Sequence, residues 1–144
     1  DDREPELVTY LVDRSGSAPE LIKDLLDSLP AEFADSDEVE QLARAAKDAI
    51  NYVAFDKIAF EPVGVALVAG GAAPVSRLLV IAVREPHRRR GVATALLARI
   101  HEDLVADSVA VLEVAPGELA KQAAGFLAAS GFAPDVTGNL RKAV

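Results

Sequence analysis

The amino-acid sequence predicts an α/β domain with a mixed, mostly antiparallel central sheet and helices on both faces. The chain has 144 residues, about the length of one domain, and 51% of them are apolar, which is enough for a packed core. Short runs of Val, Leu, Ile and Ala follow segments with a helical apolar period. The predicted order is β-α-α-β-β-β-α-β-α-β, in a single domain that covers residues 1–144.

The first part of the chain predicts one strand and two helices. Leu7–Asp13 has the composition of a strand. A helix follows from Ser17, a good capping residue, to Pro30, which cannot continue a helix. Ser36 caps a second helix, whose apolar face comprises Val39, Leu42, Ala43, Ala46 and Ile50.

The middle of the chain predicts successive strands, because its apolar runs are short and bounded by turn residues. The strands cover Tyr52–Asp56, Val63–Ala69 and Val75–Val83, and they form an antiparallel meander. A long amphipathic helix comes next. Its apolar face comprises Val92, Leu96, Ile100 and Leu104.

The last part predicts a strand over Val109–Val114 and a helix over Glu118–Ala129, with Gly131 as a left-handed cap. The strands before and after the long helix should pair in parallel, through a right-handed crossover. The remaining tail has room for one or two edge strands.

Composition excludes several classes of site. The chain has no cysteine, which excludes disulfides, thiolate catalysis and Cys-ligated metal sites. Its two histidines are fourteen positions apart and predict no metal site, so no metal is expected. The net charge of −8 argues against a nucleic-acid partner.

No segment predicts export or a membrane span. The first residues are charged and lack the apolar core of a signal peptide. The longest apolar tract, Val63–Val83, contains one charge, Arg77, and is interrupted by Gly70-Gly71 and Pro74. Two strands explain this tract better than a membrane helix does. We therefore expect a cytoplasmic protein without a membrane partner.

Charge is unevenly distributed along the chain. Residues 1–56 hold 15 acidic and 5 basic side chains, whereas residues 57–144 hold 8 and 10. The basic residues of the second half concentrate in residues 84–91, REPHRRRG, between a buried strand and the long helix. A helix N-terminus offers unpaired N–H groups and a positive dipole end, and Gly91 allows close approach, so this segment predicts a phosphate site. The alternative is a solvated arginine cluster.

Two motifs in the second half resemble one known family. Arg88-Arg89-Arg90-Gly91-Val92-Ala93, after the strand that ends at Val83, resembles the acetyl-CoA signature R/Q-x-x-G-x-G/A of the GNAT N-acetyltransferase superfamily. Residues 123–132, AAGFLAASGF, resemble its later motif F-Y-x-x-x-G-F. The order of elements also matches that family, which implies the acyl-CoA N-acyltransferase fold.

The resemblance implies a donor site for acetyl-CoA. The pyrophosphate would bind backbone N–H groups of the turn and first helical residues, and the pantetheine would pair with the end of the preceding strand. In this family the strands before and after the long helix part, and the thioester lies between them. The implied contacts are Ala82, Val83, Arg88, Arg89, Arg90, Gly91, Val92, Ala93, Thr94, Phe126 and Leu127.

The catalytic groups are harder to assign. The family motif usually carries a tyrosine acid where this chain has Leu127, and an asparagine where it has Ala120. Glu113, in a Leu-Glu-Val stretch, is the best candidate for the general base, since family members with this stretch are thought to use that glutamate. The alternative is a glutamate at a strand end that faces solvent or pairs with an arginine.

The acidic first half suggests an amine acceptor, either a small molecule or a peptide. In this fold the two early helices wall the acceptor side, where Glu32, Phe33 and Asp35 would suit a cationic amine. Acidic residues at helix starts are also ordinary features of dipole stabilisation and solubility.

The sequence thus favours an acetyl-CoA-dependent N-acetyltransferase that acts by direct attack in a ternary complex. An acyl-CoA-binding regulatory module with little or no transferase activity is the alternative, favoured by Leu127 and by the lack of a carboxylate on Arg77–Val83. The oligomeric state is left open, a homodimer included.

Overall fold

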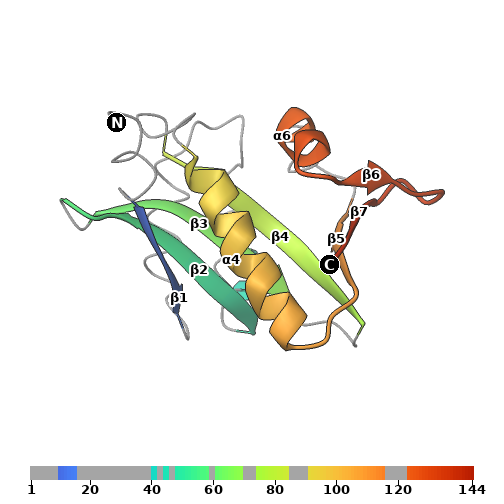
Figure 1. Ribbon diagram of the computed structural model, residues 1–144, viewed down its shortest axis with the longest axis horizontal. Coiled ribbons are helices and arrows are strands. Elements are labelled where there is room, and N and C mark those ends of the chain that lie inside the picture. Colours follow the sequence, from blue (N-terminus) through green and yellow to red (C-terminus); the bar gives the residue numbers. More distant parts are fainter. Residues whose placement is uncertain are drawn as a thin grey trace.

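A computed structural model describes residues 10–15, 40–41, 44–45, 48–58, 61–69, 74–84, 91–115 and 123–144 (Figure 1). These residues form a seven-stranded sheet in the order β1-β2-β3-β4-β5-β7-β6. The strands are β1 (Tyr10–Ser15), β2 (Ala49–Asp56), β3 (Pro62–Ala69), β4 (Val75–Val83), β5 (Val111–Val114), β6 (Ala133–Pro134) and β7 (Leu140–Ala143). The helices with described bounds are α4 (Val92–Ala106) and α6 (Ala124–Ala129).

The pairing of the strands confirms the predicted fold class. β1 to β4 form an antiparallel meander, and β4 then pairs in parallel with β5 across the α4 connection. β7 pairs with both β5 and β6, antiparallel in each case. The tail was expected at an edge, but its longer strand, β7, lies inside the sheet. β7 matches the full length of β5, from Val111↔Ala143 to Val114↔Leu140, and leaves the edge to the short β6.

Most predicted strand ends agree with the structure, but β1 ends at Ser15 instead of Asp13, and β5 starts at Val111 instead of Val109. β4 has the predicted bounds, and α4 contains the whole predicted apolar face. Ile50, expected on a helix, lies in β2, because β2 begins at Ala49 and pairs Ile50 with Val68 of β3. Pairing with a neighbouring strand outweighs the helical spacing there.

Parts of the prediction lie outside the described residues. These are the first helix, most of the second and the first half of the last predicted helix. Among the described residues, no helix has both the length and the apolar character needed to cross a membrane.

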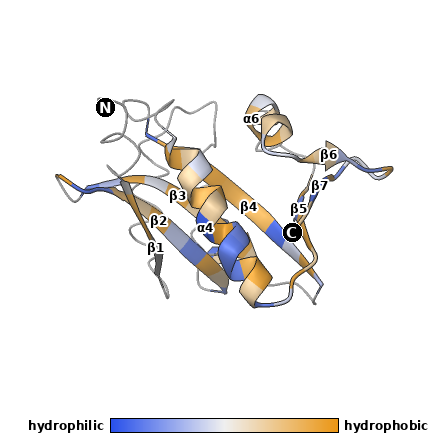
Figure 2. Ribbon diagram, viewed as in Figure 1, coloured by the Kyte–Doolittle hydropathy of each residue, from blue (hydrophilic) through white to orange (hydrophobic). Residues whose placement is uncertain are grey.

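α4 lies across one face of the meander and covers the main core (Figure 1). Apolar residues line β3 and β4 beneath it (Figure 2). Val92, Leu96, Ile100 and Leu104 of α4 are at most 2% exposed. They pack in one cluster with buried residues of the sheet, which include Tyr52, Ala66, Val68, Leu78 and Leu112.

α6 ends as the sequence predicts. Gly131 has φ 100°, its N–H donates to the carbonyl of Ala128, and the N–H of Phe132 donates to that of Leu127. This pair of bonds is a Schellman cap, which requires a left-handed residue. The cap turns the chain back, so that Leu127 and Phe132, 0% and 4% exposed, both enter the main core.

Candidate functional site

The end of β4 and the first turn of α4 meet at Gly64 of β3. The register places Val83 opposite Gly64, and the N–H of Arg84 donates to the carbonyl of Val63 at 2.8 Å. A Cβ on Gly64 would lie 2.9 Å from Cγ1 of Val92 and 3.3 Å from the carbonyl oxygen of Ala82. A glycine is needed here because the helix packs directly on the strand backbone.

Gly91 gives the start of α4 the character of an anion site. It is the N-cap residue, with φ 83°, and it has no side chain to cap the first N–H groups. The first turn holds no acidic residue that would offset the positive end of the helix. Apart from Gly91, its chain neighbours and the backbone of its own helix, no described atom lies within 4 Å of the position a Cβ would take on Gly91. Among the residues described, the first N–H groups of α4 thus have no side-chain cap, which suits an anion.

The predicted contacts that follow Gly91 differ in exposure. Val92 is 2% exposed and belongs to the core, so only its backbone can serve a ligand. Ala93 is half-buried, whereas Thr94 is exposed. Arg88, Arg89 and Arg90, and the predicted acceptor residues Glu32, Phe33 and Asp35, lie outside the described residues.

Arg84 is a further candidate ligand that the sequence analysis did not select. It follows β4 directly and is half-buried. Within the described part of the chain, its Nε is buried and has no hydrogen-bond partner. A buried guanidinium N–H without an acceptor is costly, and an anionic ligand would supply one. This observation fits a phosphate-bearing donor near the predicted turn. The sequence signal for Arg84 as a ligand was its place in the basic segment REPHRRRG, residues 84–91.

β4 and β5 pair only over the first part of β4. The parallel register covers Val75–Arg77 against Val111–Glu113 and does not extend further in the described strands, although β4 continues to Val83. A β-bulge follows at once, because Leu67 faces Val80 and Val68 faces Leu78, which leaves Leu79 as the extra residue. Bulges bend a strand and increase its twist. β4 then runs toward the start of α4, and β5 toward α6 (Figure 1).

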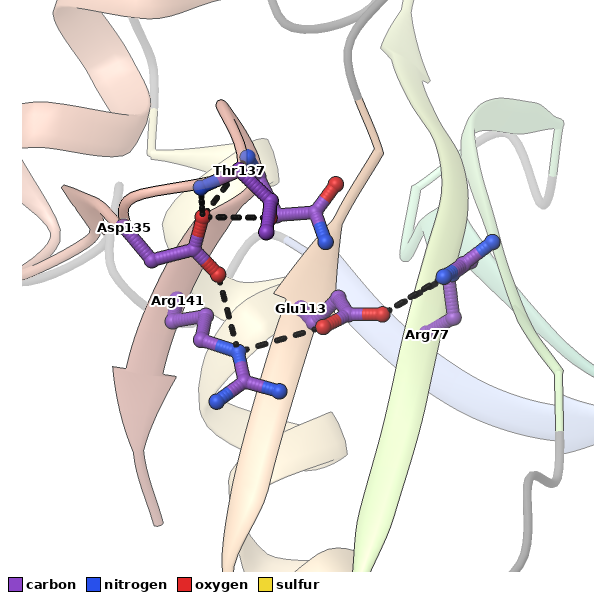
Figure 3. Close-up of polar contacts among 6 residues, drawn as sticks. Arg77, Glu113, Asp135, Thr137 and Arg141 are labelled. Carbon is purple, nitrogen blue, oxygen red and sulfur yellow. Dashed lines mark hydrogen bonds and ion pairs between the residues drawn. The ribbon is translucent and has the colours of Figure 1, made fainter.

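Glu113 lies at the last paired position and is held between two arginines (Figure 3). Nε and Nη2 of Arg77 donate to its Oε1 at 3.2 and 2.6 Å, and Nε of Arg141 donates to its Oε2 at 3.1 Å. Glu113 is 6% exposed. Its neighbours Leu112 and Val114 enter the core with α4, so Glu113 lies on the opposite face of the sheet.

The arginines lower the pKa of Glu113 below its ordinary value of 4.5. The hydrogen bond from Arg77 has the largest effect, and burial opposes it without reversing it. A general base for an amine works best with a pKa near the working pH, which is the opposite direction. The role of Glu113 as base stays a prediction, and its contacts favour the alternative of pairing with an arginine. Arg77, the one charge in the apolar tract, was the sequence signal for this pair.

The predicted pantetheine contacts lie at the end of β4 and on α6. Ala82 is 3% exposed and Val83 is half-buried at the end of β4. Leu127 is 0% exposed, and Phe126 packs against the same core cluster, which includes Val114 of β5. Side chains from α6 and the end of β5 thus share one apolar cluster.

Tyr52 does not replace the tyrosine that the motif lacks. Its hydroxyl donates to Oδ2 of Asp103 at 2.8 Å, and Tyr52 is 0% exposed. Asp103 follows Gly91 by twelve residues along α4, so this contact lies about 18 Å from the start of the helix. The other tyrosine, Tyr10, lies in β1, at an edge of the sheet.

The chain is similar in sequence and in fold to known proteins. A family model described as the acetyltransferase (GNAT) family matches residues 18–132. None of the curated protein sequences compared with the chain matches it significantly.

Solved structures are similar over almost their whole length. An acetyltransferase of the GNAT family from Elizabethkingia anophelis, with acetyl-CoA bound, is 13% identical with a TM-score of 0.73, and 95% of this chain and 99% of that chain are covered. The IAA acetyltransferase from Bacillus cereus is 18% identical with a TM-score of 0.71, over 94% and 99%. The ribosomal-protein-S18-alanine N-acetyltransferase from Escherichia coli is 16% identical with a TM-score of 0.71, over 93% and 94%. At these identities the likeness shows the fold.

Proposed function

Because this chain belongs to the GNAT acetyltransferase family, we propose that it transfers the acetyl group of acetyl-CoA to a primary amine of a small molecule or peptide. One observation carries the proposal. β4 leaves β5 after Arg77 and Glu113, and α4 starts at Gly91 without a side-chain cap. A donor with a strand-like arm and a phosphate end matches both features.

The phosphate end of acetyl-CoA would bind at the start of α4. Backbone N–H groups from Gly91 to Thr94 supply donors, and the side chain of Arg84 supplies a cation with an unpaired Nε. Arg88, Arg89 and Arg90 are proposed to add positive charge in the turn. The similar structure from Elizabethkingia anophelis, which has acetyl-CoA bound, supports this choice of donor.

The pantetheine arm would bind along the end of β4. An extended amide chain can add to a strand edge through main-chain hydrogen bonds, which is what Ala82 and Val83 are proposed to provide. Phe126 and Leu127 lie in the apolar cluster that also holds the end of β5. Phe126, which is half-buried, suits the apolar part of the arm, whereas the side chain of Leu127 is fully buried and supports this apolar cluster from within the core.

The reaction we propose is direct attack within a ternary complex. The lone pair of a neutral amine attacks the thioester carbonyl carbon, and a tetrahedral oxyanion forms. Its collapse breaks the C–S bond, which releases CoA thiolate and leaves an amide, while the amine gives up one proton to a base or to water. Much of the acceleration can come from holding the amine against the thioester.

This chain lacks the tyrosine that usually serves as the acid in the family motif, and its base is not established by position either. Leu127 has no proton to give to the thiolate, and it is fully buried. Glu113 is the base that the sequence predicts, but two arginines engage its carboxylate, which opposes that role. Proton transfer through water is compatible with both observations.

The acceptor is proposed to be a cationic amine drawn to the acidic first part of the chain. Glu32, Phe33 and Asp35 are the predicted contacts. The name of the similar alanine N-acetyltransferase from Escherichia coli supports an amine as the acceptor class. A cytoplasmic location stays a prediction.

Calorimetric titration with acetyl-CoA tests the donor. We expect saturable binding, and no heat at high micromolar ligand would remove the proposal. Release of free CoA with a panel of amines then tests the transfer. Because the chain has no cysteine, a thiol reagent reports CoA alone.

An acyl-CoA-binding regulatory module is the second candidate. The buried Leu127 and the engaged Glu113 favour it, since Leu127 has no acidic proton and the carboxylate of Glu113 is paired with two arginines. Bound acetyl-CoA without CoA release for any amine would support the module and contradict the transferase.

A further inference from the structure

We propose that Arg77, Glu113 and Arg141 form a charged clamp that fixes the point where β4 and β5 part, with Glu113 as a positioning residue and not the general base. The effect of this clamp on acetyl-CoA rests on the proposed function. Its effect on the sheet does not, and it can be measured separately.

The three residues are direct cross-strand neighbours. Arg77 faces Glu113 in the last pair of the β4–β5 register, and Glu113 faces Arg141 in the β5–β7 register. Opposite charges at directly facing positions of a sheet stabilise the pairing of their strands. One carboxylate therefore links three adjacent strands at the level where the parallel pairing ends.

Both oxygens of Glu113 are used in this link. Oε1 accepts from Arg77, with a shortest distance of 2.6 Å, and Oε2 accepts from Arg141 at 3.1 Å. The Glu113 side chain is 7% exposed, whereas those of Arg77 and Arg141 are 47% and 45% exposed. A buried carboxylate needs such partners, because an unpaired buried charge is strongly unfavourable.

Asp135 holds the Arg141 end of the clamp (Figure 3). Its Oδ2 lies 3.4 Å from Nε of Arg141. Its Oδ1 accepts from the N–H and hydroxyl of Thr137 and from the N–H of Asn139, at 2.8, 2.7 and 3.1 Å. The turn between β6 and β7 thus anchors Arg141, and the clamp spans from β4 to this turn.

The clamp lies at the level where the pairing of β4 and β5 ends. It can therefore fix how far apart the two strands run beyond that level. The register of β4 with β3 shifts at Leu79, two residues after Arg77, and β5 ends one residue after Glu113. Without the clamp, β5 is free to shift or fray relative to β4. Either change alters the width available to a donor arm along β4, and a misplacement of about 1 Å can cost on the order of 100-fold in rate.

The same contacts oppose a role as general base. A protonated amine that approached Glu113 would meet two guanidinium groups, and the carboxylate would have to leave at least one of them to accept a proton. A positioning role for Glu113 keeps its contacts with Arg77 and Arg141. A role as general base requires that at least one of these contacts breaks.

The first test measures the sheet itself. Amide hydrogen exchange is followed in the paired segments Val75–Arg77 and Val111–Glu113 for Arg77→Gln, Glu113→Gln and Arg77→Lys. We expect faster exchange there in both glutamine variants and near wild-type exchange in Arg77→Lys, which keeps the cation. Glu102→Gln, an exposed carboxylate on α4, is the matched control and should change nothing. Unchanged exchange in both glutamine variants would overturn the clamp.

The second test separates positioning from base catalysis. For positioning, Arg77→Gln and Glu113→Gln should lower kcat/KM by similar factors, on the order of 10- to 100-fold. The double variant should lose no more than the worse single one. The acidic limb of the pH profile should keep its place in all variants.

A base role gives a different pattern. Glu113→Gln would then abolish the acidic limb, and Arg77→Gln would move it to higher pH, because loss of the guanidinium raises the pKa of the carboxyl. That pattern would overturn the positioning role. If the wild-type protein neither binds nor uses acetyl-CoA, the proposed function fails, while the exchange experiment still decides whether the clamp exists.

Discussion

At the scale of single residues, Glu113 links stability to pH. Arg77 and Arg141 hold its pKa below the ordinary 4.5, and hydrogen bonds from Thr137 and Asn139 hold that of Asp135 below 3.8. A carboxyl whose pKa is lowered by folding contributes stability that is fully present above its unfolded pKa. That contribution is lost as pH falls through the folded value.

We therefore expect the free energy of unfolding to decline on acidification below about pH 4.5. Glu113→Gln should be less stable than wild type at neutral pH and should decline less, so that the two curves converge at low pH. Denaturant unfolding at a series of pH values measures this. Parallel curves for wild type and Glu113→Gln would contradict it, and Glu102→Gln should follow wild type.

Gly91 provides a second prediction at this scale. Gly91→Ala places a side chain at φ 83°, which costs about 1–2 kcal/mol, and puts a methyl group where the phosphate is proposed to approach. We expect acetyl-CoA affinity to fall by about tenfold. Gly138→Ala, at φ 91° in the turn before β7, carries the same strain away from this site. Calorimetry should show loss of affinity in the first variant and none in the second.

At the scale of elements, the close packing of α4 on β3 is the feature most open to test. Gly64→Ala sets a methyl group 2.9 Å from Cγ1 of Val92, a stiff β-branched side chain. We expect a loss of about 1–3 kcal/mol in the free energy of unfolding. Acetyl-CoA binding should weaken as well, since the first turn of α4 must move.

Gly125→Ala is the matched control for this prediction. Gly125 lies in α6, and a Cβ there meets no atom within 4 Å among the residues described. Alanine in a helix should stabilise by about 0.5–1 kcal/mol. Denaturant unfolding of both variants measures the contrast, and equal effects would contradict the close approach at Gly64.

The far half of α4 is joined to the sheet by two partly buried hydrogen bonds. Tyr52 of β2 donates to Asp103, and Arg99 of α4 donates to the carbonyl of Val12 in β1 at 3.1 Å. Tyr52→Phe should lower the free energy of unfolding by about 1 kcal/mol. Val105→Ala, at an exposed position of α4, should stay within about 0.5 kcal/mol of wild type. Thermal unfolding of both variants distinguishes a structural Tyr52 from a neutral one.

At the scale of the whole molecule, the unequal charge of the two halves bears on the acceptor. Residues 1–56 hold most of the acidic excess, and a field from that part would attract cationic amines. We expect polyamines and aminoglycosides to be better acceptors than anionic amines. Their kcat/KM should fall as ionic strength rises from about 0.01 to 0.15 M, because the Debye length shrinks from about 30 to 8 Å. A preference for anionic acceptors, or rates independent of salt, would contradict this.

The fold could be predicted from the sequence because its signals are local. The strand Val75–Val83, the apolar face of α4 and the glycine cap at Gly131 each follow from residue type and spacing, and the structure confirms them. The parallel β4–β5 pair also followed, since a strand-helix-strand unit allows few arrangements. The start of β2 and the place of β7 did not follow, because strand partners chosen across the sheet decided both.

The sequence by itself determined the class of the protein and predicted a phosphate site at the start of α4. The glycine, the basic turn and the helix start are consecutive in the chain, so spacing is enough to find them. The side chains that contact Glu113 follow only from the tertiary structure. Arg77 and Arg141 lie 36 and 28 positions away along the chain, and three strands had to pair in one register before their charges could meet its carboxylate.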